Sequence, residues 1–398
     1  MDAVLTEQRA AQRSPLTSWL GVVSVTAGLF SLVTTEILPI GLLTSIGADF
    51  TVSDGMAGLM MTMPGFLAAV AAPLVTAATG RVDRRRMLGA FMLLLALANF
   101  VAATADAYGW ILASRAAVGV TIGGFWSLGA GLAPRLVPAA AVGRATALIF
   151  AAVPLGSVLG VPLGTFVGDV AGWRTAFAAM GVLSLAVCAA LWTVLPPLPP
   201  EQVTRLRTLG RQLGCGGTRF ALLVTFLVVL AHFGTYTYVT PFLEQVTGAG
   251  PAVITVALLT YGAAGMLGNF VGGTAAARRP HGTFAAAAAL IAGATLLLPV
   301  LGRTGAGAFV LLVAWGVGYG AVPVCSQTLF AKAAPETGAV EASSTLFTAS
   351  FQATISTGAL AGGALLDRSS PSVVLAVGGA VALAVVPVVG RRRGTAAT

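Results

Sequence analysis

Long apolar runs dominate this sequence and leave it few ways to fold. A helix of about 18 or more apolar residues is long enough to cross the hydrocarbon core of a bilayer, and the chain contains twelve such runs. We therefore expect an integral membrane protein of the all-α class. The runs lie near residues 17–46, 57–78, 88–105, 110–133, 145–168, 174–195, 219–241, 252–277, 283–301, 307–330, 341–366 and 372–390.

The overall composition supports a membrane location over a set of soluble domains. Hydrophobic residues make up 57% of the 398 residues and charged residues only 9%, against about 25% in soluble domains. The chain therefore lacks the polar surface that water requires. The net charge of +9 does not indicate nucleic-acid binding, because the basic residues lie in short segments between the apolar runs.

Neither a cysteine framework nor a signal peptide is predicted. The three cysteines, Cys188, Cys215 and Cys325, share no motif spacing, so we expect no disulfide framework, no metal site and no cofactor. A polar segment, Met1 to Ser14, precedes the first apolar run. At roughly thirty residues this run is longer than the apolar region of a cleavable signal, so we expect it to remain as the first span.

Basic residues are distributed unevenly about the predicted spans. With the N-terminus inside, 18 of the 22 lysines and arginines fall on the inner side and 3 on the outer side. This bias follows the positive-inside rule and predicts a multi-pass protein of the cell inner membrane with both termini in the cytoplasm. The outer residues are Arg174, Arg303 and Arg368, and Arg115 lies within a span.

The chain divides into two halves of six spans. The break begins with the sequence PPLPP and carries several arginines, which is typical of a cytoplasmic linker. We predict an N-terminal half over residues 1–195, a linker over 196–218 and a C-terminal half over 219–398. Six spans followed by six in the same orientation form the parallel repeat of the major facilitator fold, whose solute site lies between the halves.

An internal repeat supports this division. An offset of 197 residues superposes a set of glycine, proline and basic residues of the first half on the same kinds of residue in the second. The pairs are Gly65 with Gly262, Arg81 with Arg278, Gly119 with Gly316, Gly123 with Gly320, Arg135 with Lys332, and Pro138 with Pro335.

Several segments resemble one group within the major facilitator superfamily. Residues 34–53, TTEILPIGLLTSIGADFTVS, resemble a first-span signature, and residues 80–88, GRVDRRRML, resemble a shortened version of the loop between spans two and three. Ser114 to Phe177 and the segment TYTYVTPFLEQVTG are similar as well. The chain thus resembles the drug:proton antiporters of the arabinose-efflux-permease-like group. This resemblance implies export of sugars, nucleosides or purines, or antibiotics.

Glu36 is the only acid in the interior of any predicted span. A carboxylate at this depth costs about 2.5–3.5 kcal/mol unless it is paired, hydrated or protonated. We therefore predict Glu36 as a proton carrier. The alternative is a buried hydrogen-bonding anchor that satisfies a carbonyl group freed by the kink at Pro39.

Arg115 is the only base within a span that cannot lose its charge. Counted along their helices, Arg115 and Glu36 lie at one depth, and spans one and four both line the cavity in a major facilitator arrangement. We therefore predict that the two residues pair in proton coupling. Arg115 also resembles the arginine of the family's fourth-span motif, here LASRAAVG. The alternative is an arginine that extends outward to lipid headgroups.

Other polar and aromatic residues within the spans are candidates for the site. His232 either relays protons or binds solute, or it is a neutral histidine bonded across a helix interface. Five further residues are predicted to line a mixed polar and aromatic substrate cavity, although residues of these kinds also stabilise contacts between helices. They are Trp126, Tyr236, Asn269, Gln327 and Gln352.

Two motifs bear on gating and on the direction of transport. Gly156, Gly160, Pro162 and Gly164 resemble the antiporter motif in the fifth span of exporters, where glycine permits close helix approach and proline bends the axis. This resemblance favours export. Asp83 and Arg84 either latch helix ends in one conformer or follow from the topology alone.

We expect a secondary transporter that exports a small solute by alternating access, driven by protons, and acts as a monomer. Drug resistance is among the roles that the resemblance implies. The alternatives are an uptake symporter or facilitator and, more remotely, a polytopic membrane enzyme. The chain has two histidines and no HExxH, DxxD or GxSxG motif at a span end, so we predict that it is not an enzyme.

Overall fold

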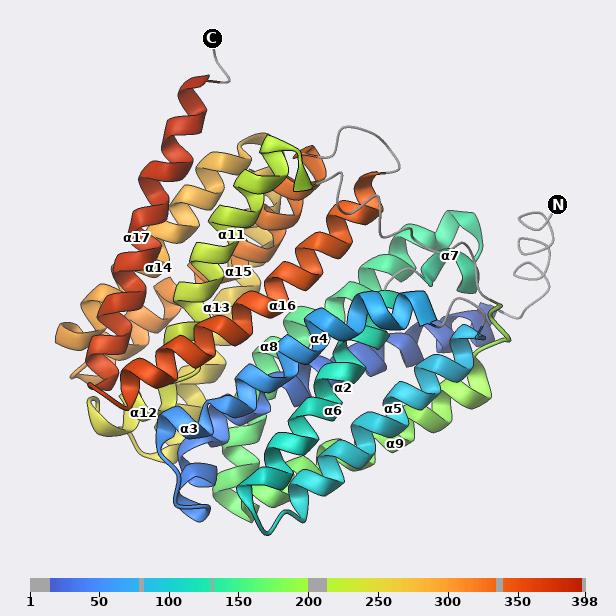
Figure 1. Ribbon diagram of the computed structural model, residues 1–398, viewed down its shortest axis with the longest axis horizontal. Coiled ribbons are helices and arrows are strands. Elements are labelled where there is room, and N and C mark those ends of the chain that lie inside the picture. Colours follow the sequence, from blue (N-terminus) through green and yellow to red (C-terminus); the bar gives the residue numbers. More distant parts are fainter. Residues whose placement is uncertain (1–14, 79–81, 130–131, 200–212, 334–338, 396–398) are drawn as a thin grey trace.

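The computed structural model describes residues 15–78, 82–129, 132–199, 213–333 and 339–395. Within these ranges the chain forms helices and no strands, and twelve helices contain 20 residues or more (Figure 1). They are α2 (Pro15–Asp49), α4 (Leu59–Ala78), α5 (Arg84–Ala103), α6 (Tyr108–Gly129), α8 (Val142–Ala171), α9 (Trp173–Val194), α11 (Gly216–Tyr236), α13 (Pro251–Arg278), α14 (Pro280–Leu301), α15 (Gly305–Ala333), α16 (Ala339–Leu366) and α17 (Pro371–Thr395).

Each long helix overlaps one of the predicted spans, and ten helical segments are long and apolar enough to cross a membrane. The prediction of an all-helical membrane protein is therefore confirmed. Four short segments lie between the long helices: α3 (Asp54–Ala57), α7 (Ala133–Leu136), the 3-10 turn η1 (Ala139–Ala141) and α12 (Val239–Gln245). Most of the predicted linker, residues 200–212, lies outside the described residues, as do Arg81 and Pro335 of the repeat.

The outer surface of this protein differs from that of a soluble protein. Large apolar side chains face outward, and Phe270 and Val310 are 71% and 69% exposed. The charged side chains of Glu36 and Arg115 are instead buried, at 8% and 1% exposure. Exposed apolar side chains in this number indicate contact with lipid, and the polar groups find their partners inside the bundle.

Local sequence signals set several helix ends. Asp83 caps α5 by accepting hydrogen bonds from the backbone N–H groups of Arg85 and Arg86, which satisfies donors that have no partner within the helix. Pro280 stands in the first turn of α14, where its missing N–H costs nothing. Gly172 separates α8 from α9 at a φ of 84°, a conformation that side chains with a Cβ rarely adopt.

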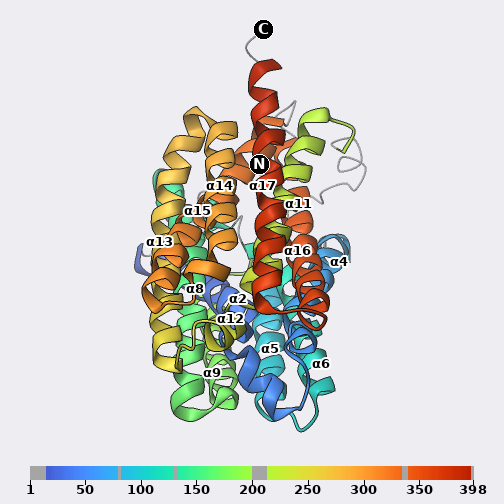
Figure 2. The same cartoon turned by 90° about the vertical axis from the view of Figure 1, so that its left-hand side faces the viewer.

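The two halves pack their helices in the same way. In the first half α4 packs on α6, α5 on α9 and α2 on α8. In the second half the corresponding pairs are α13 on α15, α14 on α17 and α11 on α16. Figure 2 shows the second set of helices in the upper part of the molecule and α5, α6 and α9 in the lower part. The parallel repeat is thus present in the packing as well as in the sequence.

The repeat extends to individual close contacts. A Cβ atom added to Gly119 would meet the Pro64 carbonyl, and one added to Gly316 would meet the Tyr261 carbonyl. These contacts differ in both partners by the same offset of 197 residues that superposes the sequences. A Cβ atom added to Gly123 would likewise meet the Ala68 carbonyl, and one added to Gly320 would meet the Gly265 carbonyl. Glycine at these positions lets the two helix backbones touch.

The halves meet along a seam that joins α16 to α4 and α13 to α8. In Figure 1 the two halves lie close together at the end of the bundle that holds α3 and α12. They are further apart at the end that holds α7 and the beginning of α11. We call the first of these the far end of the bundle. We call the opposite end, at which α9 finishes and α11 begins, the linker end.

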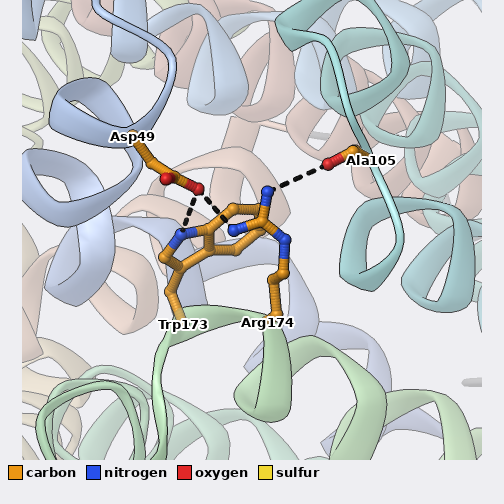
Figure 3. Close-up of polar contacts among 4 residues, drawn as sticks. All are labelled: Asp49, Ala105, Trp173 and Arg174. Atoms are coloured by element: carbon orange, nitrogen blue, oxygen red, sulfur yellow. Dashed lines mark hydrogen bonds and ion pairs between the residues drawn. The ribbon is translucent and has the colours of Figure 1, made fainter.

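A polar cluster closes the far end of the N-terminal half (Figure 3). Arg174, at the start of α9, forms an ion pair with Asp49 at the end of α2, and it also donates to the Ala105 carbonyl at 3.0 Å. The indole N–H of Trp173 donates to the same Asp49 carboxylate at 3.2 Å. One arginine thereby ties together the ends of three segments.

The close contact at Gly123 generates a stability prediction. A Cβ at this position would lie 2.7 Å from the Ala68 carbonyl oxygen and 2.7 Å from the Ala72 backbone nitrogen, and backbone atoms cannot yield as a flexible side chain can. We expect Gly123→Ala to destabilise the protein by about 1–3 kcal/mol, the usual cost of overpacking. Thermal unfolding in detergent measures the loss.

The matched control for this variant is Gly293→Ala in α14, where an added Cβ meets nothing within 4 Å. Alanine is also the better helix former, so this control variant is expected to be neutral or slightly more stable. Equal stability of the two variants would contradict the proposed packing between α4 and α6.

Candidate functional site

The candidate site is centred on Glu36, in the middle of α2. Its carboxylate is buried, and its Oε1 atom accepts a hydrogen bond of 3.1 Å from the Gln352 side-chain amide on α16. Glu36 belongs to the first half and Gln352 to the second, so this bond crosses the seam. Glu36 was predicted as a proton carrier and Gln352 as a residue of the cavity, and the structure places them in direct contact.

The glycine motif of α8 faces the helix that carries Glu36. Cβ atoms added to Gly156, Gly160 and Gly164 would lie 2.9, 3.1 and 2.5 Å from the side chains of Val33, Ile37 and Leu38 of α2. Pro162 is buried on the same helix. The motif thus allows α8 to pack against α2 on both sides of Glu36, which fixes the position of the carboxylate.

Arg115 is buried beside Glu36 without touching it. One guanidinium nitrogen, Nη1, donates to the backbone carbonyl of Thr35 at 3.0 Å, and the guanidinium lies 5.6 Å from the centre of the Phe177 ring. Glu36 is within electrostatic range of Arg115, but among the described residues the two make no ion pair. At 1% exposure the side chain of Arg115 does not extend to lipid headgroups.

Asn99 completes this polar group in the N-terminal half. Its side-chain amide donates to the Thr35 hydroxyl at 3.3 Å and to the Leu95 carbonyl at 2.9 Å. Thr35 therefore receives one hydrogen bond on its backbone carbonyl and another on its side chain. The residue directly before Glu36 is held from α5 and from α6, and this limits the rotation of α2 at the carboxylate.

His232 lies in a buried group of aromatic rings in the C-terminal half. It stacks on Tyr319 of α15 with ring centres 3.3 Å apart and on Tyr236 with centres 5.1 Å apart. The indole N–H of Trp315 donates to His232 Nδ1 at 3.1 Å. The predicted residues His232 and Tyr236 are therefore neighbours, and the Tyr319 ring brings this group within electrostatic range of Glu36.

The remaining predicted cavity residues lie apart from Glu36. Trp126 contacts Phe150 in the first half, with ring centres 6.2 Å apart. Asn269 is half-buried on α13, and Gln327 is exposed near the linker end of α15. The structure gives these three residues no contact with Glu36, Gln352 or the ring stack.

Asp83 and Arg84 lie at the linker end of the N-terminal half. Besides capping α5, Asp83 accepts a hydrogen bond of 2.8 Å from the Leu198 backbone N–H. The backbone N–H of Arg84 donates to the Leu198 carbonyl at 2.9 Å. These bonds hold the start of the linker against α5, within one half of the protein.

Several hydrogen bonds join the two halves between Glu36 and the far end. Thr44 donates to Glu244 at 3.1 Å, Thr240 donates to the Ile40 carbonyl at 2.9 Å, and Gly55 donates to Asp367 at 3.1 Å. The Gln245 amide also donates to Asp54 at 3.2 Å. The far end of the bundle is thus closed in this conformer.

Sequence reasoning missed four residues of the site: Asn99, Tyr261, Trp315 and Tyr319. Tyr319 and Trp315 stand four positions apart on α15, as His232 and Tyr236 do on α11, so each pair lies on one helix face. That spacing is a usable signal, but it does not show which faces meet. Among the described residues, no group of three His, Cys, Asp or Glu side chains is arranged to hold a metal ion.

Comparison with known proteins shows the family to which this chain belongs. Residues 23–348 match the family model of the Major Facilitator Superfamily. The purine ribonucleoside efflux pump NepI of Escherichia coli strain K12 is 30% identical over 92% of both chains. The protein named transcription regulatory protein OpdE of Pseudomonas aeruginosa is 35% identical over 88% of both.

Solved structures agree in fold. A bacterial homologue of the human lysosomal transporter Spinster, inward-facing and unoccupied, superposes with a TM-score of 0.73 at 17% identity, covering 94% of this chain and 95% of the other. The human organic anion transporter MFSD10 superposes with a TM-score of 0.65 at 17% identity, covering 95% of this chain and all of the other. The chain belongs to the major facilitator superfamily. It is a secondary transporter and not an enzyme, as predicted.

The separation of Glu36 and Arg115 generates a prediction about their coupling. Removing Arg115 leaves the Glu36 carboxylate without the nearest positive charge, which is costly in a buried site. We therefore expect Arg115→Ala to be less stable than the double variant with Glu36→Gln, with a coupling energy of about 0.5–3 kcal/mol. A thermal-unfolding double-mutant cycle in detergent measures this energy. Strictly additive effects would mean that Arg115 acts only through Thr35 and Phe177.

Proposed function

We propose that this transporter exports a small solute in exchange for protons, with Glu36 as the residue that carries the proton. The observation that carries this proposal is the hydrogen bond from Gln352 to Glu36, because it joins the one intramembrane acid directly to the opposite half. A carboxylate inside a bilayer is retained at a cost, and such residues commonly mark proton pathways.

The geometry suggests how the proton and the conformational change are linked. Alternating access moves the two halves against each other about a site near the midplane. In the conformer described, Glu36 accepts a hydrogen bond from the Gln352 side-chain amide of the opposite half. Any movement that separates the two residues removes this bond, so the relative position of the halves and the protonation of Glu36 are linked.

Purine ribonucleosides are the substrate class that we propose first. The support is the named activity of NepI, which is 30% identical over 92% of this chain, together with the buried aromatic rings around His232. The resemblance to the drug:proton antiporters of the arabinose-efflux-permease-like group leaves antibiotic export, and hence drug resistance, as a second substrate class for the same site.

Export is favoured over uptake by the glycine motif of α8, which packs against α2 on both sides of Glu36. An uptake symporter with the same residues is the alternative direction. We further propose that the chain works as a monomer, with its two halves, residues 1–195 and 219–398, moving as units about the linker.

We propose that the linker end of the bundle faces the cytoplasm of the cell inner membrane. The described basic residues of the predicted inner side, such as Arg144, Arg219 and Arg279, stand at the linker ends of their helices. Arg174 and Arg303 stand at the far end. This distribution follows the positive-inside rule.

Cysteine labelling tests this orientation. In a background without the three native cysteines, a membrane-impermeant maleimide applied to whole cells should label cysteines introduced at Ser53 and Thr104. Both of these positions are exposed at the far end. A cysteine at Gly214, exposed at the linker end, should react only after the membrane is opened. The reverse pattern would invert the topology.

Replacing Glu36 tests the proton-coupling mechanism. Glu36→Gln keeps the side-chain size and the capacity to bond Gln352, but it removes the titrating group. We therefore expect solute binding to remain and proton movement coupled to the solute to fall at least tenfold, which is the loss expected for an essential proton carrier. Proton flux into proteoliposomes on addition of a purine ribonucleoside is the measurement. Undiminished coupled flux would exclude Glu36 as the carrier and leave His232 as the next residue to test.

A further inference from the structure

Four rings in the C-terminal half form a nearly parallel stack. Tyr261 lies on Tyr236 with centres 4.5 Å apart and planes inclined by 25°. Tyr236 lies on His232 at 17°, and His232 lies on Tyr319 at 6°. The rings come from α13, α11 and α15, so the stack joins three helices. Offset parallel stacking is a preferred arrangement of aromatic rings.

The Trp315 ring packs nearly perpendicular to three rings of this stack. Its ring is inclined by 78° to His232, by 85° to Tyr236 and by 78° to Tyr261. Its indole N–H donates to His232 Nδ1, so Nδ1 acts as the acceptor and the imidazole proton of the neutral form lies on Nε2. Phe233 stands edge-on to Tyr319, at 89°. The orientation of the stack is therefore fixed by its neighbours.

Tyr319 is the most exposed ring of the stack. Tyr236 and Tyr261 are each 6% exposed and His232 is fully buried, whereas Tyr319 is half-buried. One face of the Tyr319 ring is covered by His232. In the described part of the chain, no aromatic ring stacks on its other face. This end of the stack is also the one within electrostatic range of Glu36.

Three buried polar side-chain atoms without hydrogen-bond partners lie on α16 and α2, the helices that carry Gln352 and Glu36. Among the described residues, the Gln352 side-chain oxygen, the Ser356 hydroxyl and the Thr34 hydroxyl are buried and make no hydrogen bond. Gln352 and Ser356 stand one turn apart on α16, and Thr34 precedes Glu36 by two residues on α2. The Thr34 hydroxyl lies near Gly156 of α8 and the Ser356 hydroxyl near Gly65 of α4, so only the Gln352 oxygen belongs to the residue that bonds Glu36. Buried polar groups are normally bonded, and this acceptor is therefore available to a ligand that donates a hydrogen bond.

We propose that the face of Tyr319 opposite His232 is the stacking platform for a flat nitrogen heterocycle, such as a purine base, whose edge is read by the side-chain amide of Gln352. This inference rests on the proposed export function and assigns residues to its substrate. The base continues the existing stack of rings, and a ring N–H or an exocyclic amine donates to the free Gln352 oxygen. Gln352 then contacts the base and Glu36 together, which connects occupancy to the proton site.

The stack favours a planar base over two other solutes. A quaternary ammonium ion needs aromatic faces directed at one point from several sides, whereas the four rings of this stack lie nearly parallel to one another. A free sugar has no π face to stack. Stacking of bases on aromatic side chains is strong and tolerates different bases, because every base has a π face.

Binding to the full-length protein in detergent tests the proposal. Adenosine, ribose and tetraethylammonium are titrated by calorimetry into the wild type, Tyr319→Phe and Tyr319→Leu. We expect the wild type to bind adenosine and to bind the other two at least tenfold more weakly. Tyr319→Phe should bind adenosine within about threefold of the wild type, because the ring remains. Tyr319→Leu should bind it about tenfold or more weakly.

Control variants keep the interpretation clear. Phe270→Leu removes an aromatic ring that is 71% exposed on the lipid-facing side of α13, and adenosine binding should be unchanged. Tyr319→Met is a second variant that fills the space with a flexible side chain, for use if Tyr319→Leu does not fold. Thermal unfolding of each variant separates loss of the fold from loss of binding.

Three outcomes would overturn the proposal, and they are distinguishable from one another. Unchanged adenosine affinity in Tyr319→Leu and Tyr319→Met, with coupled export of adenosine intact, would remove the platform but leave the proposed function. Equal affinity for ribose and adenosine would show that the base is not recognised. Absence of adenosine binding in the wild type, with proton-coupled transport of another solute, would overturn both the platform and the nucleoside as substrate.

Discussion

Close approach of helix backbones at glycine holds this bundle together. Apolar helices gain nothing from leaving lipid, so their association depends on van der Waals contact and on internal polar bonds. Gly119 and Gly123 allow α6 to pack closely against α4, and the repeat-related Gly316 and Gly320 allow α15 to pack closely against α13. The glycines of α8 bring that helix against α2. The glycines, which have no side chain, therefore determine where α2 and its Glu36 lie in the bundle.

The two halves share one plan but carry different chemistry. Glu36 and Arg115 place the charges in the first half, whereas the second half carries the ring stack. The offset of 197 residues relates Thr35, which receives bonds from Arg115 and Asn99, to His232, which receives a bond from Trp315. Equivalent positions of the repeat have thus become a polar centre and an aromatic centre. Gln352 brings the second half into contact with the first, because its amide reaches Glu36 across the seam.

The sequence by itself determined the membrane class, the twelve helices, the repeat and the presence of two charged residues, Glu36 and Arg115, inside the spans. Each of these follows from a property that can be read along one segment. An apolar run of sufficient length has no stable place outside lipid, and a charged residue inside such a run is costly enough to stand out. The glycine motif of α8 was recognisable as well, because glycine at one-turn spacing indicates close packing wherever it occurs.

Only the tertiary structure decided which residues meet. Gln352 lies 316 positions from Glu36, Arg115 bonds a backbone carbonyl and not the expected carboxylate, and Tyr319, Tyr261 and Trp315 join His232 in a stack. Trp126, Asn269 and Gln327 instead lie elsewhere. The physical reason is that a helix which is apolar all round has no amphipathic stripe. Its sequence sets its length and depth in the membrane, while its rotation about its own axis is set only by the neighbours against which it packs.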